Sequence, residues 1–154
     1  MFYNRARKKG NTNMRLWHYK IIPFLPDLQL IAQWRELNSI FKKQDKHILI
    51  NYVYEYEKRH LFAYTQMVLT EMANRGFIVR NFGNLGEYFN CSAMSLTDFS
   101  IKNPFPKHHN NRYLLQNFYN LQEKYDRGQK GFGYEVYNKM RTFMLKEKLI
   151  DEIH

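Results

Sequence analysis

Residues 28–42 read LQLIAQWRELNSIFK, and this stretch predicts the first main helix of the chain. Apolar side chains recur in it every three or four residues, the spacing that puts them on one face of an α-helix. Asp27, which follows Pro26, is expected to cap the N-terminus of the helix. The side chains on the predicted apolar face are Leu28, Ile31, Trp34, Leu37 and Phe41.

Segments 58–75, 111–126 and 134–150 carry apolar residues at the same helical spacing. Gly76 follows the first of them as a C′ glycine, and Asn110 and Asn111 are expected to cap the second. The four segments together predict an all-α fold of about four helices. The side chains expected to be buried together are Trp34, Leu37, Leu61, Val68, Leu69, Leu114 and Phe118.

The segments between these helices are less regular. Residues 46–56 are rich in Ile, Val and Tyr, and their type stays open. Residues 81–109 have little periodicity and predict a long irregular loop, which in a compact domain often serves function. Residues 1–13 are basic and are either a flexible arm or an upstream extension ahead of a start at Met14.

The composition indicates a folded protein that binds polyanions. A chain of 154 residues with 44% hydrophobic and 25% charged residues suits one compact globular domain. Lys and Arg number 24 against 14 Asp and Glu, a formal charge of +10. Such a charge attracts nucleic acid first and acidic membrane surfaces second.

Several classes of site and location are not expected. Cys91 is the only cysteine, which excludes an internal disulfide and any metal site built on several cysteines. No phosphate-binding Gly loop with GK[ST], HExxH or GxSxG motif occurs, so we expect no metal and no cofactor. Without a signal-type or membrane-spanning apolar run, we expect a cytoplasmic, nucleoid-associated protein of a bacterium, or the host cytoplasm for a viral protein.

Residues 14–41, MRLWHYKIIPFLPDLQLIAQWRELNSIF, carry a family resemblance. The W-R-E-L core and following I-F are similar to the catalytic helix of the pyrimidine-dimer DNA glycosylases, whose best-known member is a phage endonuclease V. The opening MRLWHYK is closer to a bacterial branch. Segments 47–77, with INYVY and EMANRGF, and 106–121 resemble the family's second and third helices. The resemblance covers residues 14–125 and implies a single compact endonuclease V-like domain.

The resemblance also implies a mechanism. Such enzymes break the bond between base and sugar at a pyrimidine dimer, with the chain's own α-amine as nucleophile, and the resulting imine allows β-elimination of the 3′ phosphate. An α-amine has a pKa of about 8 and is partly unprotonated near neutral pH. Glu36 matches the carboxylate that assists, and Arg35 the arginine that would hold a phosphate and keep Glu36 ionised. The nucleophilic amine aligns with Arg15, and Met14 is the alternative.

Some family positions differ in this sequence. Gln29 stands where the phage enzyme has His, and Ser39 where it has Arg. Tyr119 and Glu123 replace two basic residues of the third helix, whereas His109 is kept. Alongside Arg35 and His109, the side chains expected to contact DNA phosphates are Lys20, Lys42, Lys43, Arg112 and Lys124.

We therefore expect a DNA repair glycosylase with associated AP-lyase activity, a monomer that acts on damaged double-stranded DNA. The domain would comprise residues 14–127, with a C-terminal helical extension over 128–154. The alternative is a catalytically silent DNA- or RNA-binding protein on the same scaffold. A third hypothesis, membrane-surface binding by the last helix, is less favoured because the basic residues of that helix are mixed with acidic ones. The mass of the mature N-terminus separates the first two readings, since a start at Met14 favours the enzyme.

Overall fold

The structure is a computed structural model that describes residues 14–44, 46–90 and 101–153. The basic segment 1–13 and Cys91 lie outside these ranges. The described residues contain no β-strand, so the predicted all-α fold is confirmed. The elements are the 3-10 helices η1 (Tyr19–Phe24) and η2 (Asn51–Glu55), and the α-helices α2 (Asp27–Lys43), α3 (Lys58–Asn74), α4 (Leu85–Phe89), α5 (Asn111–Asp126) and α6 (Tyr134–Lys146).

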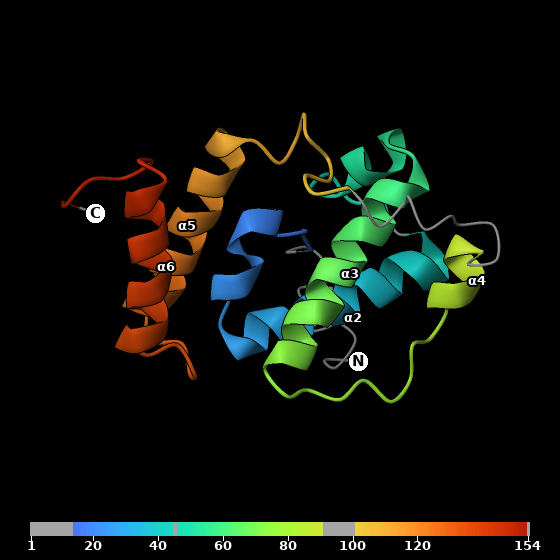
Figure 1. The fold of residues 1–154 in the computed structure, drawn as a ribbon, viewed down its shortest axis with the longest axis horizontal. Coiled ribbons are helices and arrows are strands. Elements are labelled where there is room, and N and C mark those ends of the chain that lie inside the picture. The colour runs from blue at the N-terminus through green and yellow to red at the C-terminus, as the bar shows by residue number, and fades with distance from the viewer. Residues whose placement is uncertain (1–13, 45, 91–100, 154) are drawn as a thin grey trace, which may run out of the picture.

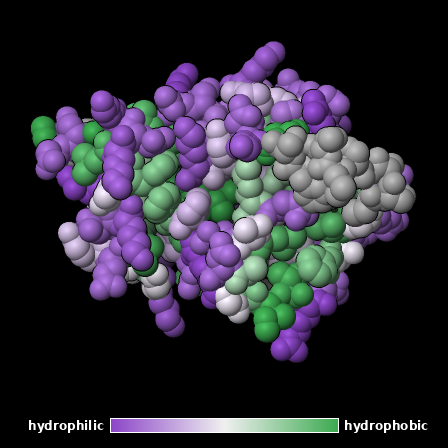
Figure 2. Space-filling model, viewed as in Figure 1, coloured by the Kyte–Doolittle hydropathy of each residue, from purple (hydrophilic) through white to green (hydrophobic). Residues whose placement is uncertain are grey.

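The short helix η1 lies at the centre of the fold. It contacts α3 on one side and α5 and α6 on the other, while α2 packs against both α3 and α4 (Figure 1). The segment 14–18, which precedes η1, is thereby enclosed by helices that come from distant parts of the chain. Figure 2 shows hydrophilic side chains over most of one face, with apolar side chains gathered over the segment after α3, where Ile78 is 78% exposed.

The predicted core is confirmed with one exception. Trp34, Leu37, Leu61, Val68, Leu114 and Phe118 are all buried, whereas Leu69 is only half-buried and packs against the edge of the core. The prediction for Leu69 was wrong because it follows Val68 directly, and consecutive residues on a helix point about 100° apart. Met72, one turn beyond Val68, takes the buried position.

The apolar face of α2 is also rotated from the predicted one. Leu28 is 50% exposed, while Leu30 is fully buried. The buried face continues through Gln33, Trp34 and Leu37, so that a polar side chain stands among apolar ones. Its hydrogen bonds, described below, explain why Gln33 is tolerated at a fully buried position.

The helix ends were predicted in most cases. The Oδ1 of Asn110 accepts the Tyr113 main-chain N–H at 3.0 Å, as expected of an N-cap, and Gly76 has the positive φ of 83° expected after α3. Asp27, however, is the first residue of α2 and caps nothing; its carboxylate pairs with Arg75 at 2.9 Å. The last helix ends at Lys146 instead of residue 150, because Lys148 adopts a left-handed conformation with φ of 58°.

Two connecting segments have more structure than predicted. Residues 46–56 form a turn followed by η2, which settles the open type of this segment as 3-10 helix. The expected irregular loop over 81–109 contains the short helix α4 within its described residues. This part of the prediction was wrong because Phe89 packs edge-on against Phe41 and Phe62, a tertiary contact that no local period reveals.

The C-terminal segment is joined to the core. Met140 and Met144 of α6 are fully buried, and α6 contacts both α5 and η1. None of the helices in the described ranges combines the length and apolar character that a membrane crossing requires.

Candidate active site

A cleft of about 410 Å³ opens beside the middle of α2. The segment before η1, the helix α2 and the helix α5 supply its walls, which consist of Arg15, Trp17, Gln29, Ala32, Glu36, Asn120, Glu123 and Lys124. Recesses of about 380 and 420 Å³ occur elsewhere around Pro23, but they contain none of the predicted site residues. The cleft at α2 is therefore the candidate functional site, because predicted site residues line it.

Glu36 meets the main chain of Arg15 at this cleft. The Arg15 main-chain N–H donates to the Glu36 carboxylate, and Gln33 Nε2 donates to Glu36 Oε2 at 2.9 Å. Within the described ranges, no Lys, Arg or His forms an ion pair with Glu36. The carboxylate is thus held by neutral donors, and the proximity to the Met14–Arg15 backbone that the resemblance implied is present.

Burial raises the pKa of Glu36 from its ordinary value of about 4.5 to about 7. The Arg15 N–H, the charges of Arg15 and Arg35, and the Gln33 hydrogen bond all lower that pKa, but desolvation outweighs them. The charge of Arg35 thus acts on the Glu36 pKa in the expected direction, but the effect of burial is larger. A carboxyl group with a pKa near neutrality can both donate and accept a proton, as acid–base catalysis requires.

Gln33 connects Glu36 to the main chain of the segment before η1. Its Nε2 donates to the Arg15 carbonyl at 2.9 Å as well as to Glu36, and its Oε1 accepts the Trp17 N–H at 2.7 Å. Arg15 also places its guanidinium carbon 5.3 Å from the centre of the Trp17 ring. The mouth of the cleft is thus formed by a main-chain segment whose hydrogen bonds are made by side chains.

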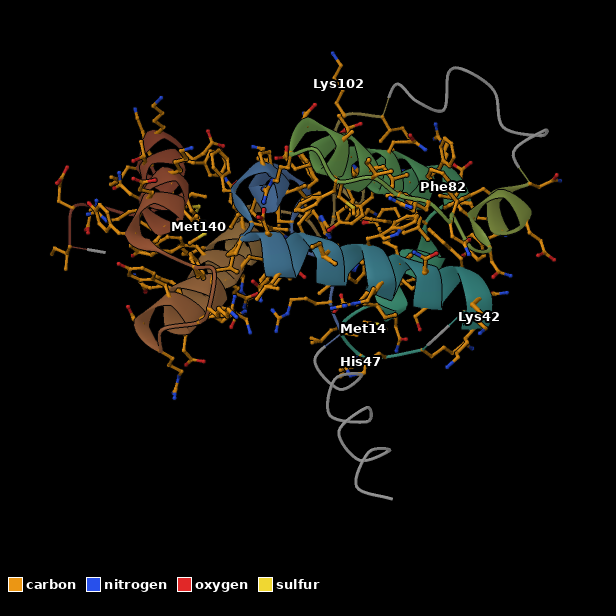
Figure 3. All side chains as sticks on the ribbon, turned by 90° about the horizontal axis from the view of Figure 1, so that it is seen from below. Met14, Lys42, His47, Phe82, Lys102 and Met140 are labelled. Atoms are coloured by element: carbon orange, nitrogen blue, oxygen red, sulfur yellow. The ribbon has the colours of Figure 1, made fainter. Side chains whose placement is uncertain are left out.

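The structure places three of the predicted site residues, Arg15, Glu36 and Lys124, on the cleft. Arg35 is exposed beside Glu36. Lys42 and Lys43 follow Arg35 and Glu36 by seven residues each, about two helical turns, and therefore lie on nearly the same side of α2. Figure 3 shows Met14, whose side chain is buried, beside α2, and Lys42 at the end of that helix.

The remaining predicted DNA-binding residues lie away from the cleft. Lys20 is exposed and forms an ion pair with Glu147 at 3.3 Å. Arg112 is exposed in the first turn of α5. The cleft thus contains only part of the basic set predicted from the sequence.

His109 is part of the core. Only 4% of it is exposed, its Nε2 hydrogen-bonds the Tyr52 hydroxyl at 2.6 Å, and burial lowers its pKa well below the ordinary value of 6.5. A buried neutral ring has no access to a phosphate, so the expected DNA contact by His109 does not fit the structure. The physical reason is packing, because the ring lies among the aromatic side chains of His18, Tyr52, Tyr64, Phe105 and Tyr113.

Three residues at the site were not predicted from the sequence: Trp17, Gln33 and Asn120. A signal for Gln33 was present, because it is a polar residue adjacent to Trp34 within the apolar period of α2. Gln29, noted only as a departure from the family, lines the cleft and exchanges two amide hydrogen bonds with Gln129, at 2.7 and 3.1 Å. The segment after α5 thereby borders the site, which no local pattern predicted.

A family model described as pyrimidine dimer DNA glycosylase matches residues 14–82. The match supports, over these residues, the resemblance found from the sequence. It begins at Met14 and contains Arg15, Gln33 and Glu36, so the matched segment supplies one wall of the cleft and its carboxylate. The other wall, from Asn120 to Lys124, lies beyond the matched residues. No curated protein and no solved structure matches the chain.

By its description, the family matched by this segment acts on DNA. Within the described ranges, no group of three or more His, Cys, Asp or Glu side chains is arranged to hold a metal ion.

Proposed function

We propose that this protein is a DNA repair glycosylase with associated AP-lyase activity on pyrimidine dimers in double-stranded DNA. One observation carries the proposal. Within the segment matched by the family, the main-chain nitrogen of Arg15 and the Glu36 carboxylate are hydrogen-bonded at the mouth of a cleft of about 410 Å³. An amine and a carboxyl group at one sugar are what this reaction needs.

The amine nucleophile belongs to the main chain in this proposal. A peptide nitrogen is not nucleophilic, so the active form begins at Arg15 or at Met14, one residue earlier. The amine attacks the sugar C1′, the bond from C1′ to the base breaks, and the base leaves with the bonding electrons and takes up a proton. The sugar ring then opens to an imine. The imine acidifies the C2′–H, whose removal breaks the C3′–O bond and releases the 3′ phosphate.

Glu36 serves as the proton carrier of these steps. Its raised pKa of about 7 provides both protonation states near neutral pH. The ionised form stabilises positive charge on the sugar and accepts a proton, and the protonated form returns one to the opened ring oxygen or to the leaving base. The half-buried position of Glu36 strengthens both effects, because charges interact more strongly away from water.

Basic side chains around the cleft are proposed to bind the DNA backbone. Lys124 lines the cleft, and Arg35, Lys42 and Lys43 are exposed along α2. Arg112 on α5 and Lys20 on η1 do not line the cleft, and Lys20 is already paired with Glu147. Positioning by phosphate contacts of this kind is common to proteins that take a nucleotide out of the duplex.

The second candidate function is catalytically silent binding of DNA or RNA on the same scaffold. One observation favours it: in the chain of 154 residues, Asn13 precedes Met14 and Met14 precedes Arg15, so both candidate nitrogens are peptide nitrogens. The charge of +10 would attract nucleic acid in either case.

Borohydride trapping tests the proposal. Three forms of the protein are incubated with duplexes that hold a pyrimidine dimer or an abasic site: the 154-residue chain, a chain that begins at Met14, and a chain released with Arg15 at its N-terminus. We expect reduction to crosslink one of the two shorter forms to DNA, and mass spectrometry to locate the bond at its α-amine. Lys124→Met is the matched control, since it removes the amine side chain of the cleft and should still be trapped.

Absence of a crosslink with all three forms on both substrates contradicts the glycosylase and lyase reaction. A crosslink through Lys124 in place of the α-amine contradicts the proposed nucleophile. Retained DNA binding without any crosslink supports the silent binding protein.

A further inference from the structure

We propose that Gln33 is a positioning residue that sets the Glu36 carboxylate against the main chain of Arg15, an inference that rests on the proposed function. The side chain of Gln33 is fully buried and comes from α2, three residues before Glu36. Residues at this spacing are neighbours on one side of a helix. Gln33 is therefore placed between the carboxylate and the segment that holds the nucleophilic nitrogen.

Every hydrogen-bonding position of the Gln33 amide is used. Its two N–H groups can donate to the Arg15 carbonyl and to Glu36 Oε2, both at 2.9 Å. Its oxygen accepts from the Trp17 N–H at 2.7 Å and lies 2.7 Å from the Tyr64 hydroxyl, whose single proton it shares with the Trp17 carbonyl. A side-chain amide has two donors and two acceptor sites, so this environment fixes its orientation completely.

Other residue types at position 33 do not satisfy these four partners. An apolar side chain leaves the partner groups without hydrogen bonds in a buried place, at about 1–3 kcal/mol for each unsatisfied group. A glutamate keeps the two acceptor contacts but cannot donate to the Arg15 carbonyl, and it places a second carboxylate beside Glu36. A neutral group that both donates and accepts is needed, and Gln33 provides it.

The rest of the segment is held by side chains that do not hydrogen-bond Glu36. The Tyr64 hydroxyl on α3 shares its single proton between the Trp17 carbonyl at 2.5 Å and Gln33 Oε1, and the Tyr113 hydroxyl on α5 donates to the Leu16 carbonyl at 2.6 Å. Asn117 Oδ1 accepts the His18 N–H at 2.6 Å. Among these side chains, Gln33 is the one that hydrogen-bonds both the main chain of residues 15–17 and the Glu36 carboxylate.

The consequence is a link between the geometry of the site and its protonation. A donor to the ionised carboxylate favours the ionised form, so the Gln33 contact lowers the pKa of Glu36 against the effect of burial. Loss of this donor should favour the protonated form. The charged or titratable groups that surround Glu36 or line the same cleft are Arg15, Arg35, Tyr64, Tyr113, Glu123 and Lys124.

The experiment compares Gln33→Met, which keeps length and removes the amide, with Tyr113→Phe, which removes one main-chain contact and leaves the donor to Glu36 in place. The Glu36 pKa is measured by carbon NMR titration of the folded protein, a readout independent of activity. We expect Gln33→Met to raise that pKa by about one unit and Tyr113→Phe to leave it unchanged. The single-turnover rate is measured on the form of the chain, beginning at Met14 or Arg15, that borohydride can crosslink to DNA. For Gln33→Met, the acid limb of its pH profile should shift to higher pH by the same amount, with DNA affinity unchanged.

Gln33→Glu is the second variant. It keeps the size of the side chain and its acceptor contacts, so the Glu36 pKa can still be measured if Gln33→Met does not fold. It should raise the Glu36 pKa further, because the neighbouring carboxylate repels the ionised form. An unchanged Glu36 pKa in a folded Gln33 variant, or an equal shift in Tyr113→Phe, overturns the positioning role. Failure of the wild-type protein to be trapped overturns the proposed function instead, and the titration still decides the role of Gln33.

Discussion

Arg75 and Glu36 are both charged residues that meet the main chain of a neighbouring segment, but their surroundings differ. Arg75, the C-cap of α3, donates to Glu71 at 2.8 Å, to Asp27 at 2.9 Å and to the Leu25 carbonyl at 2.6 Å. Its guanidinium is thus paired with two carboxylates, and it holds the turn between η1 and α2. Glu36 also contacts the main chain and a side chain, but its direct hydrogen-bond donors are neutral.

This difference distinguishes a structural charge, Arg75, from the charge that we propose to be reactive, Glu36. Paired opposite charges with additional hydrogen bonds keep one protonation state and one geometry. A half-buried carboxylate without a cation in contact has a pKa near neutrality and can change its protonation state during a reaction. We therefore expect changes at Arg75 to affect folding and changes at Glu36 to affect chemistry.

The largest effect is expected from Glu36→Gln, made in the form of the chain that borohydride can crosslink to DNA. This substitution keeps the shape of the side chain and removes its charge and proton transfer, so single-turnover cleavage should fall by about 100-fold or more. DNA affinity, measured by fluorescence anisotropy, should stay the same or increase because a negative charge leaves a basic surface. Full cleavage activity in this variant would contradict the assignment of Glu36.

Arg75→Met should destabilise the fold by about 2–4 kcal/mol, since it leaves two carboxylates and several carbonyl groups without their donor. Denaturant unfolding measures this loss. The single-turnover rate at a temperature where the variant is folded should stay close to that of the wild type. A large loss of rate in the folded variant would show that the two charged residues are not separate in function.

The pH dependence of stability tests the charge environment of Glu36. Its folded pKa of about 7 lies above the ordinary value of 4.5, so the folded state binds the proton more tightly, and this contribution to stability is lost as pH rises from about 4.5 through 7. Glu36→Gln removes the loss. We expect the variant to gain on the order of 1–2 kcal/mol relative to the wild type between pH 5 and pH 8, measured by chemical unfolding.

His18 changes stability in the opposite sense over an overlapping range. Burial lowers its pKa from 6.5 to about 4, so its contribution is lost as pH falls from about 6.5 through 4. His18 is present in both proteins, so its contribution cancels when the free energy of unfolding of the wild type is subtracted from that of Glu36→Gln at each pH. A difference independent of pH would mean that the Glu36 carboxyl is not shifted.

The smallest effects are expected from single exposed cations in DNA binding. Arg35→Gln or Arg112→Gln should each reduce the slope of log affinity against log salt by about one unit, provided that each meets one phosphate. Lys20→Gln is the comparison, and its effect should be smaller because Lys20 is paired with Glu147. Binding measured between about 30 and 300 mM salt, one decade of concentration, checks these slopes. An equal change for Lys20 would contradict the ranking.

Local sequence patterns predicted the helices well. The periods of apolar residues located α2, α3, α5 and α6, and the signals at Asn110 and Gly76 set two of their ends. The resemblance carried by W-R-E-L singled out Arg35 and Glu36 before any geometry was known, and the family match includes both. These predictions depend on residues close together in the chain, whose spacing is visible in the sequence.

The tertiary structure decided what those residues touch. The partners of the segment 15–18 come from α2, α3 and α5, as far as 99 residues away, and no local period shows such contacts. His109 looked like a DNA contact and is a core residue, whereas Gln33 looked like an ordinary helix residue and hydrogen-bonds the carboxylate. The sequence by itself determined the main helices and indicated Glu36 as the candidate carboxyl group. Burial and hydrogen bonding exist only once the helices pack together, and they decided the pKa of Glu36 and its neighbours.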